Sequence, residues 1–151
     1  MKLAIGSDHA GYQLKSQLAA WLKTSAGGRH QVRDVGTSSE ASCDYPDFAR
    51  PVARAVAKKR VSRGILLCGT GIGMAIAANK FRGVRAAVVW SPAVAGLAAE
   101  HNGANVICLP ARFLSLATAK KIIHVFLSTP FGGGRHLRRL KKIMALDRCA
   151  Q

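Results

Sequence analysis

Short apolar runs alternate along the chain with longer segments in which apolar residues recur at helical spacing. Over residues 11–24, for example, Leu14, Leu18 and Leu22 fall on one helical face, and Gly27-Gly28 ends the pattern. The apolar runs predict strands at 3–6, 31–35, 65–68, 86–90 and 105–109. Helical spacing predicts helices at 11–24, 46–59, 74–80, 92–102, 115–128 and 135–146.

This alternation of strands and helices indicates an α/β fold. Strands that are apolar almost throughout, with helices between them, are typical of a parallel sheet covered on both faces. We therefore expect residues 1–151 to form one domain, a three-layer α/β/α sandwich around a mostly parallel, Rossmann-like sheet of about five strands. Ligands bind such sheets beyond the carboxyl ends of the strands. Asp8, His9, Cys68 and Arg112 each follow a predicted strand and are expected at that edge.

A glycine-rich turn, Cys68-Gly69-Thr70-Gly71-Ile72-Gly73, joins the third predicted strand to a helix. Its glycines permit positive φ and bring backbone N–H groups close to a ligand, and the following helix adds its positive end. A thiol beside a helix N-terminus ionises more readily than a free thiol, whose pKa is about 8.5. Cys68 is therefore a candidate base or nucleophile.

Two common nucleotide-binding loops do not match this turn. A P-loop needs a lysine directly after its last glycine, and Lys80 comes too late. A dinucleotide-binding turn needs a third glycine where this chain has Met74, and an acidic residue about twenty positions further on, which is missing. The turn suits a single phosphate, carboxylate or oxyanion better.

The composition excludes several classes of protein. Apolar residues make up 49% of the chain, yet no apolar run approaches the ~20 residues of a membrane span. Because the first eight residues turn polar too soon for a signal peptide, we expect a cytoplasmic location. The cysteines form no CxxC pair and the histidines no HExxH motif, so we expect reduced thiols and no metal.

The charge balance is strongly basic, with 23 lysines and arginines against 7 acidic residues and a net charge of +16. Such an excess fits a solvated basic surface, phosphorylated small molecules or nucleic acid, and the charge alone does not separate these interpretations. Arg135 and Arg139 lie one turn apart on the last predicted helix. They could clamp a phosphate together, or they could belong to a solvated terminal helix.

Six segments occur in one order along the chain: Gly6-Ser7-Asp8-His9-Ala10-Gly11, Asp44-Tyr45-Pro46, the turn from Cys68 to Gly73, Ala77-Ala78-Asn79-Lys80, His101-Asn102 with Asn105, and Gly133-Gly134-Arg135-His136 with Arg139. Together they resemble the ribose-5-phosphate isomerase B family, which also includes galactose-6-phosphate and allose-6-phosphate isomerases. The resemblance extends from about residue 2 to about residue 146.

The resemblance implies an aldose–ketose isomerase, free of metal and cofactor, that acts on an open-chain sugar phosphate through an enediolate. It implies that Cys68 is the base that moves a proton between C1 and C2, that His101 assists ring opening, and that Thr70 is also catalytic. The implied substrate-binding residues are Asp8, His9, Gly69, Thr70, Gly71, Ile72, Gly73, Asn102, Arg112, Arg135 and Arg139.

The resemblance also implies homodimers, sometimes paired into tetramers, whose active sites are shared between subunits. We accordingly expect the helix at about 135–146 to lie at a subunit interface, and we expect no membrane partner. One branch of the family replaces the cysteine by a glutamate later in the turn. This chain has no carboxylate there and resembles the cysteine branch.

Three functional hypotheses follow. The leading one is interconversion of ribose 5-phosphate and ribulose 5-phosphate. Because Trp90 and Ala93 differ from the residues that relatives often carry, isomerisation of allose 6-phosphate or galactose 6-phosphate is the second hypothesis. The third is a non-catalytic basic protein that binds a phosphosugar or nucleic acid, and the intact Cys68 and His101 argue against it.

Overall fold

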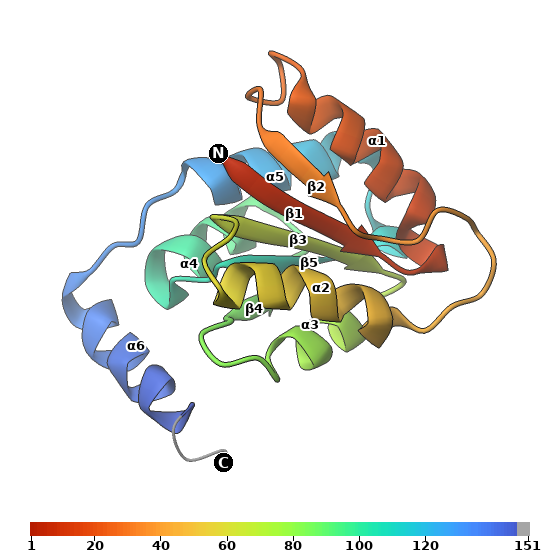
Figure 1. The fold of residues 1–151 in the computed structure, drawn as a ribbon. Helices are drawn as coiled ribbons and strands as arrows, with labels where there is room; N and C mark the ends of the chain where they lie inside the picture. Colours follow the sequence, from red (N-terminus) through yellow and green to blue (C-terminus); the bar gives the residue numbers. More distant parts are fainter. Residues whose placement is uncertain (148–151) are drawn as a thin grey trace.

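Five parallel strands form one sheet in the order β2-β1-β3-β5-β4, as the computed structural model of the chain shows for residues 1–147 (Figure 1). The expected parallel sheet is thereby confirmed. The strands are β1 (Lys2–Ser7), β2 (Gln31–Asp34), β3 (Arg63–Cys68), β4 (Ala86–Val88) and β5 (Val106–Pro110).

Helices cover both faces of this sheet and complete a three-layer α/β/α sandwich (Figure 1). On one face α1 and α4 pack beside α5, and on the other α2 packs against α3. The α-helices are α1 (Tyr12–Lys23), α2 (Tyr45–Ala57), α3 (Ile72–Ala78), α4 (Pro92–Asn102), α5 (Leu116–Ser128) and α6 (Gly134–Leu146). Short 3-10 turns, η1 (His9–Gly11) and η2 (Ala111–Phe113), follow β1 and β5.

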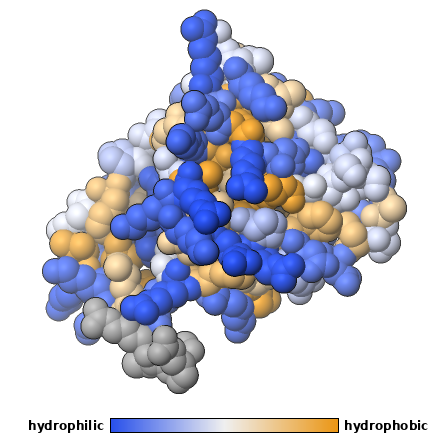
Figure 2. Space-filling view, in the orientation of Figure 1, coloured by the Kyte–Doolittle hydropathy of each residue, from blue (hydrophilic) through white to orange (hydrophobic). Residues whose placement is uncertain are grey.

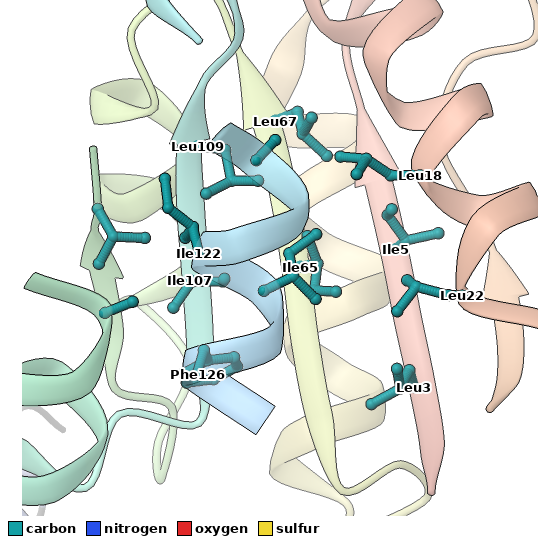
Figure 3. Packing of buried hydrophobic residues seen from close by; sticks show 14 of the residues in the cluster. Leu3, Ile5, Leu18, Leu22, Ile65, Leu67, Ile107, Leu109, Ile122 and Phe126 are labelled. Carbon is teal, nitrogen blue, oxygen red and sulfur yellow. The ribbon is translucent and has the colours of Figure 1, made fainter. Parts of the chain in front are cut away.

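The central strands β1, β3 and β5 divide their side chains between two apolar cores. Because successive strand residues point to opposite faces, Ile65 and Leu67 of β3 enter the core under α1, α4 and α5, whereas Leu66 enters the core under α2 and α3. Figure 3 shows the first core, in which Ile122 and Phe126 of α5 lie over the central strands. Burial on both faces explains why these strands are apolar almost throughout.

The register of the sheet brings three strand ends together. Leu67 pairs with Ser7 of β1, and Cys68 pairs with Pro110 of β5, so β1, β3 and β5 end side by side. The residues that follow these strands therefore gather at one edge of the sheet, as the sequence predicts for the functional residues. β5 lies between β3 and β4. The chain therefore forms the outermost strand, β4, before it returns to form β5 inside the sheet.

Helix α6 stands apart from the sandwich, to which residues 129–133 connect it (Figure 1). It meets α4, yet none of its own residues is buried. Its exposed large apolar side chains are Leu137, Ile143, Met144 and Leu146. Within residues 1–147 no helix has the length and apolar character needed to cross a membrane.

Candidate active site

Cys68 is the last residue of β3 and is buried, with 5% of the residue exposed. The backbone N–H of Gly71 donates a hydrogen bond to Cys68 Sγ over 3.1 Å. This contact requires glycine at position 71, where φ is 75° and a Cβ atom would lie 2.9 Å from the carbonyl oxygen of Cys108. The turn thus directs a main-chain donor at the thiol, which stabilises negative charge on the sulfur.

The other two glycines of the turn have a different purpose from the one the sequence suggests. The sequence indicates that all three glycines can adopt positive φ, but Gly69 and Gly73 are not among the glycines with positive φ. A Cβ atom at Gly69 would lie 3.2 Å from Nε of Arg112, and one at Gly73 would lie 2.8 Å from Cζ of Tyr45. These glycines make room for a guanidinium and a phenol ring beside the turn.

Several main-chain amides of the turn remain available to an anion. The N–H of Ile72 donates to Thr70 Oγ1 over 3.3 Å, which ties the Thr70 side chain to the start of α3. In the part of the chain that the structure describes, the N–H groups of Thr70, Gly73 and Met74 have no hydrogen-bond acceptor. Unpaired amides at a helix start are suited to bind a phosphate or an oxyanion.

Asp8 and His9 reach the same edge from the end of β1. Oδ1 of the buried Asp8 accepts a hydrogen bond from the N–H of Gly11 over 3.2 Å and so caps η1. His9 Nδ1 accepts from the backbone N–H of Cys43 over 3.2 Å, which leaves Nε2 as the protonated nitrogen of the neutral ring. Sequence reasoning gave Cys43 no role, because its 34-residue separation from His9 leaves no local signal.

Arg112 completes this set of residues. It lies on η2 directly after β5, and its backbone N–H donates to the carbonyl oxygen of Gly69 over 3.2 Å. The exposed guanidinium lies beside Gly69, where it can bind an anion held at the turn. We call the following residues the turn group: Asp8, His9, Cys68, Gly69, Thr70, Gly71, Ile72, Gly73 and Arg112.

The remaining candidate residues form a second cluster where α4 meets α6. His101 of α4 stacks on His136 of α6, with ring centroids 4.2 Å apart and planes inclined by 9°. Burial lowers the pKa of His136, and the neighbouring His101, Arg135 and Arg139 lower this pKa further. Nε2 of His101 lies 3.9 Å from a carboxylate oxygen of Glu100, which sequence reasoning did not single out. We call His101, Asn102, Arg135 and Arg139 the helix group.

The turn group lies at the carboxyl ends of the parallel strands, and the helix group lies at their amino ends. These are opposite edges of the sheet. Helix α4 ends beside the start of β5, where Nε of Arg85 donates to the carbonyl oxygen of Gly103. Cys68, in contrast, pairs with Pro110 at the end of β5. Val106 and Pro110 are roughly 13 Å apart at 3.3 Å per strand residue. One chain therefore does not bring His101 to the thiol of Cys68.

Asn79 and Asn105 lie in the segments that resemble the isomerase family, and their side chains connect neighbouring elements of the fold. The side chain of Asn79 both donates to and accepts from the backbone of Ala86, and so fixes the start of β4 to the end of α3. Asn105 accepts from the N–H of Arg85 and donates to the carbonyl oxygen of Gly83, and so joins the starts of β4 and β5. The hydrogen bonds of both side chains therefore stabilise connections between elements of the fold.

The cysteines, histidines and acidic residues that the structure describes do not assemble a metal centre. Cys43, Cys68 and Cys108 are free thiols, and burial raises the pKa of Cys108 well above its ordinary value. Cys149 lies outside the described residues. Within residues 1–147, no three His, Cys, Asp or Glu side chains come close enough together to hold a metal ion.

The chain is similar over nearly its whole length to proteins of one family. The Ribose/Galactose Isomerase family model matches residues 3–143. The chain is 43% identical to ribose-5-phosphate isomerase B of Escherichia coli over 146 residues, which cover 97% of this chain and 96% of that protein. It resembles the structure of Clostridium thermocellum ribose-5-phosphate isomerase B with a TM-score of 0.95 and 44% identity over the full length of both chains.

A ligand-bound structure is also similar. Ribose-5-phosphate isomerase B of Mycoplasma genitalium, solved with bound ribulose-5-phosphate, aligns with a TM-score of 0.92 and 44% identity. The alignment covers 97% of this chain and 96% of that one. These similarities extend over nearly the whole sequence and include both groups of candidate residues. The chain belongs to the ribose/galactose isomerase family.

Proposed function

We propose that this protein is an aldose–ketose isomerase that interconverts ribose 5-phosphate and ribulose 5-phosphate. The observation that carries the proposal is the Cys68 thiol, held by the Gly71 amide at the end of β3 within the glycine-rich turn. Relatives at 43% and 45% identity are named ribose-5-phosphate isomerase B and probable ribose-5-phosphate isomerase B, which supports the five-carbon substrate over a six-carbon one.

Cys68 is the base in this proposal. As a thiolate it takes the proton from C2 of the open-chain aldose, and the C–H electron pair forms the C1–C2 double bond of an enediolate. The carbonyl oxygen at C1 gains the negative charge, which main-chain N–H groups of the turn stabilise. The hydroxyl proton on the oxygen at C2 passes to the oxygen at C1, the Cys68 thiol returns its proton to C1, and the carbonyl re-forms at C2. The atoms balance without any redox partner.

The other candidates bind or prepare the substrate. His101 can move a proton between the anomeric hydroxyl and the ring oxygen, which opens the furanose and exposes the reactive carbonyl. Arg112, Arg135 and Arg139 offer planar guanidinium groups that match a phosphate, and His9 has a protonated Nε2 that can donate to it. Binding energy from the distant phosphate then orients the carbons that react.

A second copy of the chain completes the site in this proposal. The helix group lies at the opposite sheet edge from Cys68, so a neighbouring subunit must supply His101, Asn102, Arg135 and Arg139. Exposed apolar side chains near both groups support such an interface. Around the turn group and the adjacent strand ends these are Ile72, Trp90 and Phe113, and on α4 and α6 they are Leu97, Leu137 and Met144.

Solvent deuterium tests the reaction. In D₂O we expect ribose 5-phosphate to turn over and ribulose 5-phosphate to gain deuterium at C1, because the thiol exchanges its proton with solvent while the enediolate exists. Turnover without any deuterium would mean that hydrogen passes from C2 to C1 without contact with solvent, and would count against transfer through an exchanging thiol. Failure to turn over ribose 5-phosphate, with turnover of allose 6-phosphate or galactose 6-phosphate, would assign the six-carbon substrate.

The proposed location is the cytoplasm. Free thiols persist there, and Cys43, Cys68 and Cys108 are free thiols.

A further inference from the structure

A second basic site lies at the edge of the sheet where the strands begin. Here the end of α2 and the starts of β1, β3, β4 and β5 surround a solvent-open hollow of about 490 Å³. This edge is opposite to the one that carries Cys68. The residues lining the hollow are Lys2, Val56, Lys59, Arg60, Val61, Ser62, Arg63, Arg85 and Asn105.

Five of these nine side chains are cationic, and none is acidic. The described part of the chain forms two ion pairs, Lys15–Asp34 and His101–Glu100, and neither involves a residue of the hollow. The carboxylate of Asp147 accepts a hydrogen bond from the N–H of Gly83 and partly offsets the charge of Arg85. Within residues 1–147, most of this positive charge therefore has no carboxylate paired with it.

Two of the cations are held in place by the fold. Arg63 donates to the carbonyl oxygen of Ala104 over 2.6 Å, and Arg85 donates to those of Gly103 and Gly83. Both guanidinium groups are half-buried, and burial lowers the pKa of each; Arg85 lowers that of Arg63 further. An arginine stays charged in proteins, so two like charges share a partly desolvated wall that an anion would stabilise.

The end of α2 directs two more cations to the hollow. The backbone N–H of Lys59 donates to the carbonyl oxygen of Val56, and that of Arg60 donates to the carbonyl oxygen of Ala55, in the pattern that closes a helix with a left-handed residue. That residue is Lys59, with φ 53°, where glycine is the usual choice. The N–H of Ser62 donates to the carbonyl of Lys2 over 2.8 Å, which brings the fifth cation alongside.

We propose that this hollow binds a small molecule that carries two or more phosphate groups, at a site separate from the catalytic turn. Arginine forks match phosphate oxygens, and several cations around one hollow favour a multiply charged ligand. The volume lies within the range of about 300 to 1,000 Å³ that is typical of small-molecule sites. Half-buried guanidinium groups in a hollow also favour a compact ligand over an extended polymer.

This site gives five of the 23 lysines and arginines a purpose beyond the isomerase reaction. Figure 2 shows hydrophilic side chains gathered over the middle of the molecule, across α2 and the start of β1 in the orientation of Figure 1. The hollow shares no residue with the turn group or the helix group. Its occupancy and the isomerase activity can therefore be measured independently.

Calorimetric titration with inorganic pyrophosphate tests the proposal. The variant Lys59→Asn/Arg60→Gln removes two cations of the hollow, and asparagine accepts the left-handed backbone at position 59. The matched control, Arg50→Gln/Arg54→Gln, removes the same charge from exposed positions of α2 outside the hollow. We expect pyrophosphate to bind the first variant about tenfold or more weakly than wild type, and the control almost as well as wild type.

Parallel titrations separate this site from the catalytic one and from polymer binding. Binding of pyrophosphate must survive in Arg112→Ala, and Lys59→Asn/Arg60→Gln must retain wild-type isomerase activity. The proposal is overturned if pyrophosphate does not bind at low salt, if both double variants weaken it equally, or if Arg112→Ala abolishes it. Tighter binding of a single-stranded RNA oligonucleotide, weakened equally by both double variants, would instead assign the charge to diffuse polyanion binding.

Discussion

The backbone N–H of Gly71 donates to the Sγ atom of Cys68 over 3.1 Å, so the turn that follows β3 holds its own candidate base. The same chain segment provides the thiol at its first residue and, at Thr70 and Gly73, amides that have no acceptor among the described residues. A base and an oxyanion-binding surface thus come from one local structure. The relationship leads directly to two predictions about the turn.

The Cys68→Ala variant is expected to lose most of its isomerase activity. Removal of a positioned base costs about 10² to 10⁴ in rate, so kcat should fall by that factor while the fold persists. Cys108→Ala is the matched control, because Cys108 is a fully buried thiol of the same core with a pKa raised by burial. Steady-state kinetics on ribose 5-phosphate check both variants, and equal activities would exclude Cys68 as the base.

Gly71→Ala should reduce both stability and activity. The left-handed backbone alone costs a residue with a Cβ atom about 1 to 2 kcal/mol, and here the added atom also meets the carbonyl of Cys108 at 2.9 Å. Gly83 has a similar φ of 78°, and a Cβ atom added there would meet no other atom within 4 Å. The control variant Gly83→Ala therefore measures the backbone effect alone. Denaturant unfolding should show a larger loss for Gly71→Ala, and equal losses would contradict the contact.

The stacked pair His101 and His136 makes the contact between α4 and α6 sensitive to pH. Because the pKa of His136 is lowered from 6.5 in the folded protein, the unfolded chain binds this proton more readily. The stability contribution of this histidine is therefore complete above pH 6.5 and is lost as the pH falls toward the lowered pKa.

Thermal unfolding at about pH 7.5 and about pH 5.5 measures this effect. We expect the melting temperature of wild type to fall more on acidification than that of His136→Gln, because the glutamine side chain does not titrate. His124→Gln removes an exposed histidine of α5 and should behave like wild type. A His136→Gln variant as acid-sensitive as wild type would show that the stack does not titrate in this range.

The sequence predicts the fold because the signals for its elements are local. The apolar runs at 3–6 and 65–68 are buried on both faces, and every predicted strand and helix is present, with ends shifted by a few residues. The order of the strands could not be derived in this way. The position of β5 between β3 and β4 depends on pairing between distant segments, which leaves no periodic signal in either strand.

The candidate site is predictable in part for the same reason. Cys68 and the glycine turn are contiguous, and their placement after an apolar strand indicates an anion site. The contact between His9 and Cys43, and the stack of His101 on His136, join residues far apart in sequence. Only the folded arrangement shows that the turn group and the helix group occupy opposite edges of the sheet.

Mixing two inactive variants tests whether the site is shared between chains. If Cys68 of one subunit works with His101 of another, a dimer of Cys68→Ala with His101→Gln contains one site with both defects and one intact site. Random exchange at equal amounts makes half of the dimers mixed, so activity should return to about a quarter of wild type. The measurement is isomerase activity after the two variants are unfolded together and refolded.

The control for this experiment is a mixture of Cys68→Ala with Cys68→Ala/His101→Gln, which contains no intact thiol and should stay inactive. Activity restored in the first mixture and absent in the second would show that the turn group and the helix group meet across a subunit boundary. If neither mixture regains activity although mixed dimers form, both groups must act within one chain. That result would require α4 and α6 to move to the opposite sheet edge, against the contacts that hold Gly103 beside Arg85.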